Sequence, residues 1–269
     1  MQNAFRSRAG TFPQAEAILD ALRAGRVELA FQPVVQRAPV RAIGFFEGLA
    51  RIRLRDGSLL PPILFLPTLE DAGRLGQLDR FSLRQALTAL QHDRFARVSV
   101  NVSLQTLADP SWMNLLRREA VDRPGNTDRL IIEVTERAVH DPDIVGPFVR
   151  TVRMMGVSVV LDDFGAGQTA FRQLRDLPLD GVKIDGSFCR DVTRDRDAQC
   201  FVRALVDIAR HFEMFTVAEF VSSEQDAATL ETLGVDLLQG YHFGSPSALP
   251  DRVGGRGAWL QDLRTSSES

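Results

Sequence analysis

Short apolar runs alternate with longer amphipathic segments along most of the chain. The first two runs, residues 27–35 and 40–53, are separated by a few residues around Pro39, which predicts an antiparallel hairpin. Before them, apolar residues recur at helical spacing over residues 14–24, and Gly25 ends that helix.

Farther along, segments of helical periodicity and short strands take turns. We expect helices over 63–73, 76–91, 104–119, 142–155, 168–174, 197–212 and 223–233, and strands over 97–101, 129–133, 157–162, 181–185, 215–219 and 235–239. Short strands rich in β-branched residues, each followed by a helix, are typical of parallel βα units that are buried on both faces.

Together with the hairpin, this pattern predicts an α/β fold, a modified TIM (β/α)8 barrel in which the first strand pairs with the second. The alternative is an open doubly wound sheet. That fold normally carries a glycine-rich fingerprint after its first strand, and the sequence has none there.

Composition adds limits on location and partners. The chain has 269 residues, of which 44% are hydrophobic and 25% charged, as in ordinary globular proteins. We expect one domain over residues 14–250, with a loose leader over 1–13 and a tail over 251–269. The net charge of −3 and the lack of a long apolar run predict a cytoplasmic protein that binds neither a membrane nor a DNA or RNA polymer.

Side chains that can bind metal ions or manage protons follow the predicted strands. The set is Glu47, Asn101, Glu133, Asp162 with Asp163, Lys183 with Asp185, Glu219 and Gln239. Because the carboxyl ends of barrel strands converge on one face, we expect these side chains to meet there. Carboxylate and amide oxygens without cysteine favour Mg²⁺ or Mn²⁺, and an adjacent aspartate pair can hold two ions for phosphodiester hydrolysis.

Lys183 is the only lysine in the chain, whereas the other 31 basic residues are arginines. A compact, strongly hydrated ammonium differs chemically from a planar guanidinium. We therefore expect Lys183 to lie beside the metal ions, where it could orient the attacking water or neutralise phosphate charge.

Collinear motifs resemble the EAL domain, the bacterial phosphodiesterase module for cyclic di-GMP. They are Phe31-Gln-Pro-Val-Val35, Glu47-Gly-Leu-Ala-Arg51, Phe65-Leu-Pro67, Asn101-Val-Ser103, Glu133-Val-Thr-Glu136, Asp162-Asp-Phe-Gly165, Val182-Lys-Ile-Asp185, Ala218-Glu219 and Gln239-Gly-Tyr241. The resemblance covers about residues 14–248 and implies hydrolysis of cyclic di-GMP to linear pGpG.

The resemblance also implies a role for each matching residue. The metal ligands are Glu47, Asn101, Glu133, Asp162 and Asp163; the catalytic residues are Lys183, Glu219 and Asp163; the substrate-binding residues are Gln32, Arg51, Asp185 and Gln239; and Glu136 stabilises the loop after the aspartate pair. By the same analogy, we expect a two-metal site and a homodimer.

Two departures from the family pattern keep other functions open. Phe220 stands where glycine is usual, and Ser222 replaces a second glutamate. Because phenylalanine does not adopt positive φ cheaply, the loop after Glu219 is expected to follow another path if family members use that freedom. The alternatives are a receptor that binds cyclic di-GMP without cleaving it and a regulator that contacts other proteins.

Overall fold

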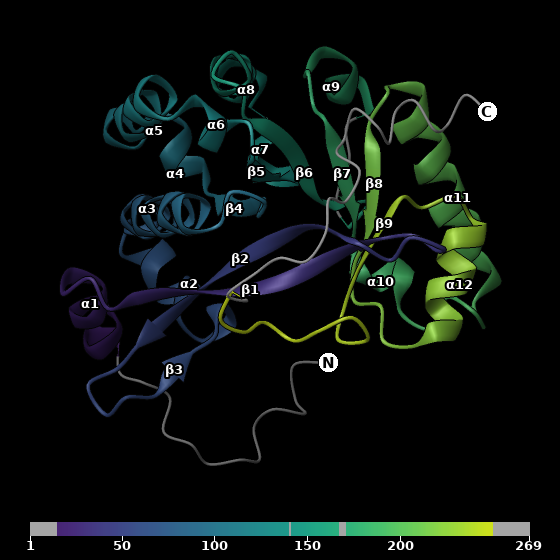
Figure 1. Ribbon diagram of the computed structural model, residues 1–269, viewed down its shortest axis with the longest axis horizontal. Helices are drawn as coiled ribbons and strands as arrows, with labels where there is room; N and C mark the ends of the chain where they lie inside the picture. Colours follow the sequence, from purple (N-terminus) through teal and green to yellow (C-terminus); the bar gives the residue numbers. More distant parts are fainter. Residues whose placement is uncertain (1–14, 140, 167–170, 250–269) are drawn as a thin grey trace.

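The computed structural model describes residues 15–139, 141–166 and 171–249. Eight strands form a closed barrel in which seven run parallel, and helices surround it (Figure 1). The barrel strands are β1 (Val27–Gln36), β2 (Ile43–Arg53), β4 (Val98–Val102), β5 (Leu130–Thr135), β6 (Ser158–Phe164), β7 (Gly181–Ile184), β8 (Phe215–Ala218) and β9 (Leu237–Gln239). The structure confirms the predicted barrel.

The barrel closes through β1, which is antiparallel to both of its neighbours. Its residues pair with β2 from Val27↔Ile52 to Val35↔Ile43 and with β9 at Val34↔Gln239. The hairpin predicted from the sequence is therefore confirmed. A two-residue strand, β3 (Leu59–Leu60), pairs with β2 outside the barrel and was too short to predict.

Helices follow most of the parallel strands and cover the outside of the barrel (Figure 1). The longer ones are α1 (Ala15–Arg23), α2 (Pro62–Asp71), α3 (Leu75–His92), α5 (Pro110–Asp122), α8 (Pro142–Arg153), α9 (Phe171–Asp176), α11 (Arg196–His211) and α12 (Glu224–Thr232). Four-residue helices are α4 (Leu104–Leu107), α6 (Pro124–Thr127), α7 (Glu136–Val139) and α10 (Gly186–Cys189). No helix in the described ranges is long and apolar enough to cross a bilayer.

The single helix expected over 104–119 is wrong, because the structure divides it into α4 and α5. Asp109 caps α5 by accepting a 2.8 Å hydrogen bond from the Ser111 amide, and Pro110 occupies the first turn. Proline suits the first turn of a helix, where its missing N–H leaves no bond unmade. Part of the helix expected over 168–174 lies outside the described residues, and α9 begins at Phe171.

Two apolar clusters position the site. The barrel interior is filled by Val34, Phe45, Ile131, Val160, Phe215, Val217 and Leu237. A separate cluster lies where β2 extends beyond the barrel, and it joins α1, α2 and the start of α3 to the hairpin. In this cluster Phe65 and Leu69 of α2 are fully buried, so α2 is anchored beside the carboxyl ends of the strands.

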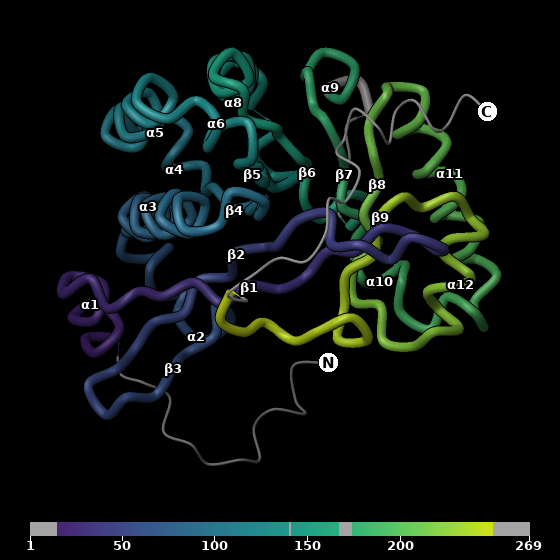
Figure 2. Tube along the Cα trace, viewed as in Figure 1, coloured from purple at the N-terminus to yellow at the C-terminus, as the bar shows by residue number. Residues whose placement is uncertain are grey.

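The segment after β9 returns along the first strand. The backbone of Phe31 exchanges two hydrogen bonds with that of Ser247, of 2.7 and 3.0 Å. Figure 2 shows this segment, in yellow, running beside the hairpin.

Candidate active site

Lys183 forms the centre of a buried ionic cluster. Its side chain is 1% exposed, and its ammonium lies near four carboxylates, which come from β2, β5, β6 and the residue after β8. The distances from Nζ are 3.2 Å to Glu47 Oε2, 3.1 Å to Glu133 Oε2, 3.3 Å to Asp162 Oδ1 and 2.7 Å to Glu219 Oε1. The convergence expected from the strand-end pattern is thus present.

Three influences set the pKa values of the groups in this cluster: burial, repulsion between the carboxylates, and attraction between the carboxylates and the ammonium. Burial disfavours charge on Lys183, but the surrounding carboxylates raise its pKa well above the ordinary value. For Glu133, burial and the neighbouring charge of Glu47 raise the pKa well above its ordinary value. Burial also opposes ionisation of Glu47, yet Lys183 and two amide donors hold its pKa below the ordinary value.

Two amide side chains orient Glu47. Gln239 Nε2 donates a 2.6 Å bond to Oε2, and Asn101 Nδ2 donates a 3.0 Å bond to Oε1. Gln32 lies behind Gln239, whose Nε2 is 3.3 Å from Gln32 Oε1, and Gln32 donates to the Gly244 carbonyl. The amides of β1, β4 and β9 therefore hold one carboxylate in a fixed orientation.

The adjacent aspartates separate because Asp163 itself turns the chain. Its φ is +58°, in the left-handed region that short polar side chains tolerate better than most. Oxygens of Asp162, Asp163 and Glu219 then lie within 4.8 Å of one another. Burial and the charge of Asp162 raise the pKa of Asp163 to about 6, and burial raises the pKa of Glu219 to about 8.

The donor set fits divalent cations. The ammonium of Lys183 faces four carboxylates, and Asp163 adds a fifth nearby, so the cluster has an excess of negative charge. An uncompensated buried charge is costly. In addition, Gln239 Oε1 is buried and accepts no hydrogen bond from the residues described. Mg²⁺ and Mn²⁺ prefer hard oxygen ligands, and either ion would supply the positive charge that this cluster lacks.

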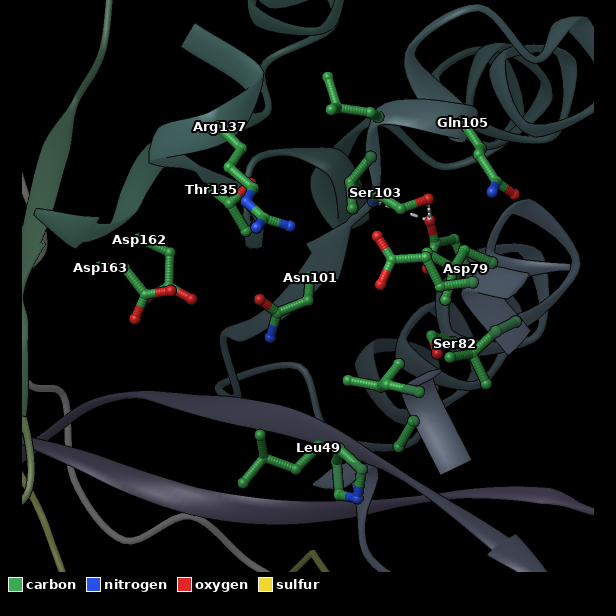
Figure 3. A pocket seen from close by; sticks show the side chains of 18 of the residues that line it. Leu49, Asp79, Ser82, Asn101, Ser103, Gln105, Thr135, Arg137, Asp162 and Asp163 are labelled. Carbon is green, nitrogen blue, oxygen red and sulfur yellow. Dashed lines mark hydrogen bonds between the residues drawn. The ribbon is translucent and has the colours of Figure 1, made fainter. Parts of the chain in front are cut away.

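A cavity of about 1000 Å³ opens from this cluster. Asp162 and Asp163 line one part of it, while Asp79, Ser82 and the apolar side chains of α2 and α3 line another (Figure 3). Its volume lies at the upper end of the range for small-molecule sites, which is enough for a dinucleotide.

Three further predicted site residues lie around the ionic cluster, and the charges of Asp185 and Glu136 help to raise the pKa of Asp163. Arg51 donates from Nη1 to the carbonyl of Ala50 at 2.9 Å and is not among the described lining residues of the cavity. Asp185 caps α10 by accepting a 2.9 Å bond from the Ser187 amide. Glu136 is buried at the start of α7, and residues 167–170 of the loop it was expected to stabilise lie outside the described residues.

Phe220 adopts the conformation that we expected to be costly for it. Its φ is +55°, so the backbone after Glu219 makes a left-handed turn although the residue is not glycine. The ring packs over Gly186, where a Cβ would lie 2.1 Å from Phe220 Cδ2, and the Arg190 guanidinium covers it at 4.9 Å. The absence of a side chain at Gly186 makes room for the phenylalanine.

The structure adds residues that the sequence analysis missed. Asp79 of α3 is buried, and its Oδ2 accepts bonds of 2.8 Å from the Ser103 amide and 2.6 Å from each of the Ser103 and Thr106 hydroxyls. A carboxylate among the apolar positions of a predicted helix was the available signal. Arg137 and Thr135 also line the cavity, and only the fold reveals their positions.

Comparison with known proteins gives a consistent result. A family model for the EAL domain matches residues 15–246. The cyclic di-GMP phosphodiesterase NbdA of Pseudomonas aeruginosa is 33% identical over 242 residues, which are 87% of this chain and 30% of that protein. The chain therefore spans about a third of the length of such a curated relative.

Solved structures resemble the fold closely. The MucR phosphodiesterase of Pseudomonas aeruginosa, in complex with cyclic di-GMP, has a TM-score of 0.78 and 28% identity, covering 86% of this chain and 96% of that one. An EAL domain protein from Listeria monocytogenes has a TM-score of 0.77 and 30% identity, covering 87% and 93% of the two chains.

Proposed function

The chain belongs to the EAL domain family, and from this premise we propose that it is a metal-dependent phosphodiesterase that hydrolyses cyclic di-GMP to linear pGpG. The observation that carries the proposal is the complete cluster of Glu47, Asn101, Glu133, Asp162 and Asp163 around the Lys183 ammonium. The solved relative with bound cyclic di-GMP supports the choice of substrate.

We assign the oxygen ligands to two sites for Mg²⁺ or Mn²⁺. Glu47, Asn101, Glu133 and Asp162 would hold one ion, and Asp162 with Asp163 would hold the other. When bound, such ions neutralise phosphate charge and lower the pKa of water. Gln239 keeps Glu47 oriented through its 2.6 Å bond, so the ligand is in place before substrate arrives.

Lys183 and Glu219 manage charge and protons in this proposal. Hydrolysis forms a bond between phosphorus and a water oxygen and breaks the bond to the 3′ oxygen, so one proton leaves the water and one reaches the leaving oxygen. Glu219, with its pKa near 8, can hold a proton at its carboxylate near neutral pH. Lys183, 2.7 Å from Glu219 Oε1, stabilises the ionised form and orients it.

The other predicted residues bind substrate from the surroundings of the cluster. We assign Gln32, Gln239 and Arg51 to substrate groups at the metal cluster, since the charge of Glu47 acts on Arg51. We assign Asp185 to substrate groups farther from the cluster. Arg51 has one nitrogen engaged with a backbone carbonyl, so the rest of its fork is available for a phosphate. Glu136 is assigned to the loop after the aspartate pair. Cytoplasmic location and a homodimer stay predictions.

The test is turnover of cyclic di-GMP by the purified chain with Mg²⁺ or Mn²⁺ and again with EDTA. We expect pGpG to appear only with the metal, and an Asp162→Asn/Asp163→Asn variant to give none. Binding without product, measured by calorimetry, would make the chain a receptor. Neither binding nor product would exclude both and favour a protein-interaction role.

A further inference from the structure

The proposed substrate presents a charge problem. A cyclic dinucleotide carries two phosphodiesters, each with one negative charge, and only one of them can lie at the metal cluster. The other must occupy the cavity, whose described wall also contains the carboxylates of Glu70, Asp79 and Glu136. Lys183 cannot reach it, because that side chain is 1% exposed and its ammonium is surrounded by carboxylates.

Arg137 is the one basic side chain among the described residues that line this cavity. It is exposed and makes no ion pair with any residue in the described ranges. Figure 3 shows its guanidinium pointing into the cavity, beside Thr135 and toward Asn101 and Ser103. An arginine that faces an acidic cavity without a carboxylate partner is available for an anionic ligand.

The strand order fixes where this guanidinium lies relative to the metal ligands. Strand β5 pairs with β4, which carries Asn101, and with β6, which carries Asp162. Arg137 follows the end of β5 by two residues, so it extends over the cavity between these two ligands. Its position is thus close to the cluster without belonging to it.

We propose that Arg137 binds the phosphodiester of the cyclic dinucleotide that is not cleaved, and so determines affinity for a substrate with two phosphates. The inference rests on the proposed function. A guanidinium fork matches two phosphate oxygens, and the Thr135 hydroxyl beside it can donate a further bond. Phe65 and Leu66 also line the cavity, and such apolar side chains suit contact with a base.

Two substrates separate this role from the chemistry at the metal cluster. Cyclic di-GMP has two phosphodiesters, whereas bis(4-nitrophenyl) phosphate has one. For Arg137→Ala, we expect KM for cyclic di-GMP to rise about tenfold or more with kcat within about threefold, because a uniform binding contact is lost. Cleavage of bis(4-nitrophenyl) phosphate should not change.

Two further variants make the comparison specific. Arg137→Lys should recover part of the affinity that the alanine variant loses, since an ammonium serves a phosphate as a point charge but lacks the second, parallel bond of the fork. Arg118→Ala, which removes an exposed arginine on α5, is the matched control and should leave both reactions unchanged. Added salt should raise KM of the unsubstituted chain more steeply than that of Arg137→Ala.

Several results would overturn the inference. An unchanged KM in Arg137→Ala would do so, as would equal losses with both substrates, which would indicate damage to the metal cluster. A lysine variant that binds no better than the alanine variant would show that positive charge at this position does not contribute to binding. If the unsubstituted chain binds without cleaving, Kd replaces KM in the same comparison. If it neither binds nor cleaves, the proposed function itself falls, and this inference with it.

Discussion

A single ammonium balances the carboxylates at the centre of the barrel, and its shape matters as much as its charge. Lys183 lies within 3.3 Å of four carboxylate oxygens in a space closed to solvent. A guanidinium is larger and planar, so its nitrogens cannot occupy the same point.

We therefore expect Lys183→Arg to lose turnover by about 100-fold or more while still binding metal and cyclic di-GMP. Steady-state rates and calorimetry on the same preparation measure the two properties. Lys183→Met serves as the comparison: it leaves the carboxylates without a cation and should lower the free energy of unfolding by about 3–5 kcal/mol. Full activity in the arginine variant would show that the ammonium has no special role.

Phe220 and Gly186 form a pair in which each residue depends on the other. The phenylalanine ring occupies the space that a Cβ at Gly186 would need. Gly186→Ala should therefore destabilise the chain by about 1–3 kcal/mol, the usual cost of overpacking.

The same substitution should cost little when Phe220 is also changed to glycine, because the clash is then removed. Denaturant unfolding of the two single variants and the double variant gives the coupling free energy, which we expect to be about 1 kcal/mol or more. Additive effects would mean that the ring moves aside without penalty. Phe220→Gly alone also removes the cost of holding a residue with a Cβ at positive φ, which is about 1–2 kcal/mol.

At the scale of elements, α3 holds the loop that follows β4. Asp79 accepts three hydrogen bonds from Ser103 and Thr106, two residues and five residues after the ligand Asn101. A second contact between the same elements is the ion pair of Arg80 with Asp109. The orientation of Asn101 thus depends on a helix that carries no ligand itself.

For Asp79→Ala we expect a loss of about 1–3 kcal/mol in the free energy of unfolding, because three donors lose their acceptor. Affinity for Mn²⁺ should fall as well, by about tenfold, as for partners that orient metal ligands. Asp180→Ala is the matched control. Asp180 is equally buried and accepts from the Val159 amide at the opposite ends of the strands. It should lower stability without changing metal affinity, and equal affinity losses in both variants would contradict the role of Asp79.

At the scale of the whole molecule, metal loading and pH act on the same excess of negative charge. The pKa values of Asp163 and Glu219 lie near 6 and 8, above their values of about 4 in an unfolded chain. The metal-free folded state therefore binds more protons than the unfolded state. Asp163 and Glu219 therefore contribute to the free energy of unfolding at low pH, and this contribution is lost as pH rises from about 4 through 8.

Metal ions should reverse this loss. With Mn²⁺ at about 100 times its Kd, the gain of about 2.7 kcal/mol should raise Tm by roughly 5–10 °C. The shift should be larger at pH 8 than at pH 6, because protons compete for the ligands. Thermal melts with Mn²⁺ or EDTA at both pH values measure it. Asp163→Asn should weaken the pH dependence, and an equal shift at both pH values would contradict the assignment.

The sequence allowed the fold to be predicted more completely than the residues that line the cavity. Most barrel strands are short apolar runs with a polar residue in or just after their second half, and this local pattern predicts both the strands and the face on which their polar side chains meet. The break between α4 and α5 was also readable in Asp109-Pro110. Arg137 was not, because nothing local distinguishes an arginine that faces a cavity from one that faces solvent.

The pairing of β1 with β9 has a consequence for synthesis of the chain. These strands lie about two hundred residues apart, so contacts of high sequence separation close the barrel. While β9 is still in the ribosome, any sheet formed by the emerged strands in their native order would have β1 and β8 as free edges. The strand that removes both edges also delivers Gln239 to Glu47. Protection from aggregation and completion of the ligand cluster therefore arrive together, at the last step of translation of the barrel.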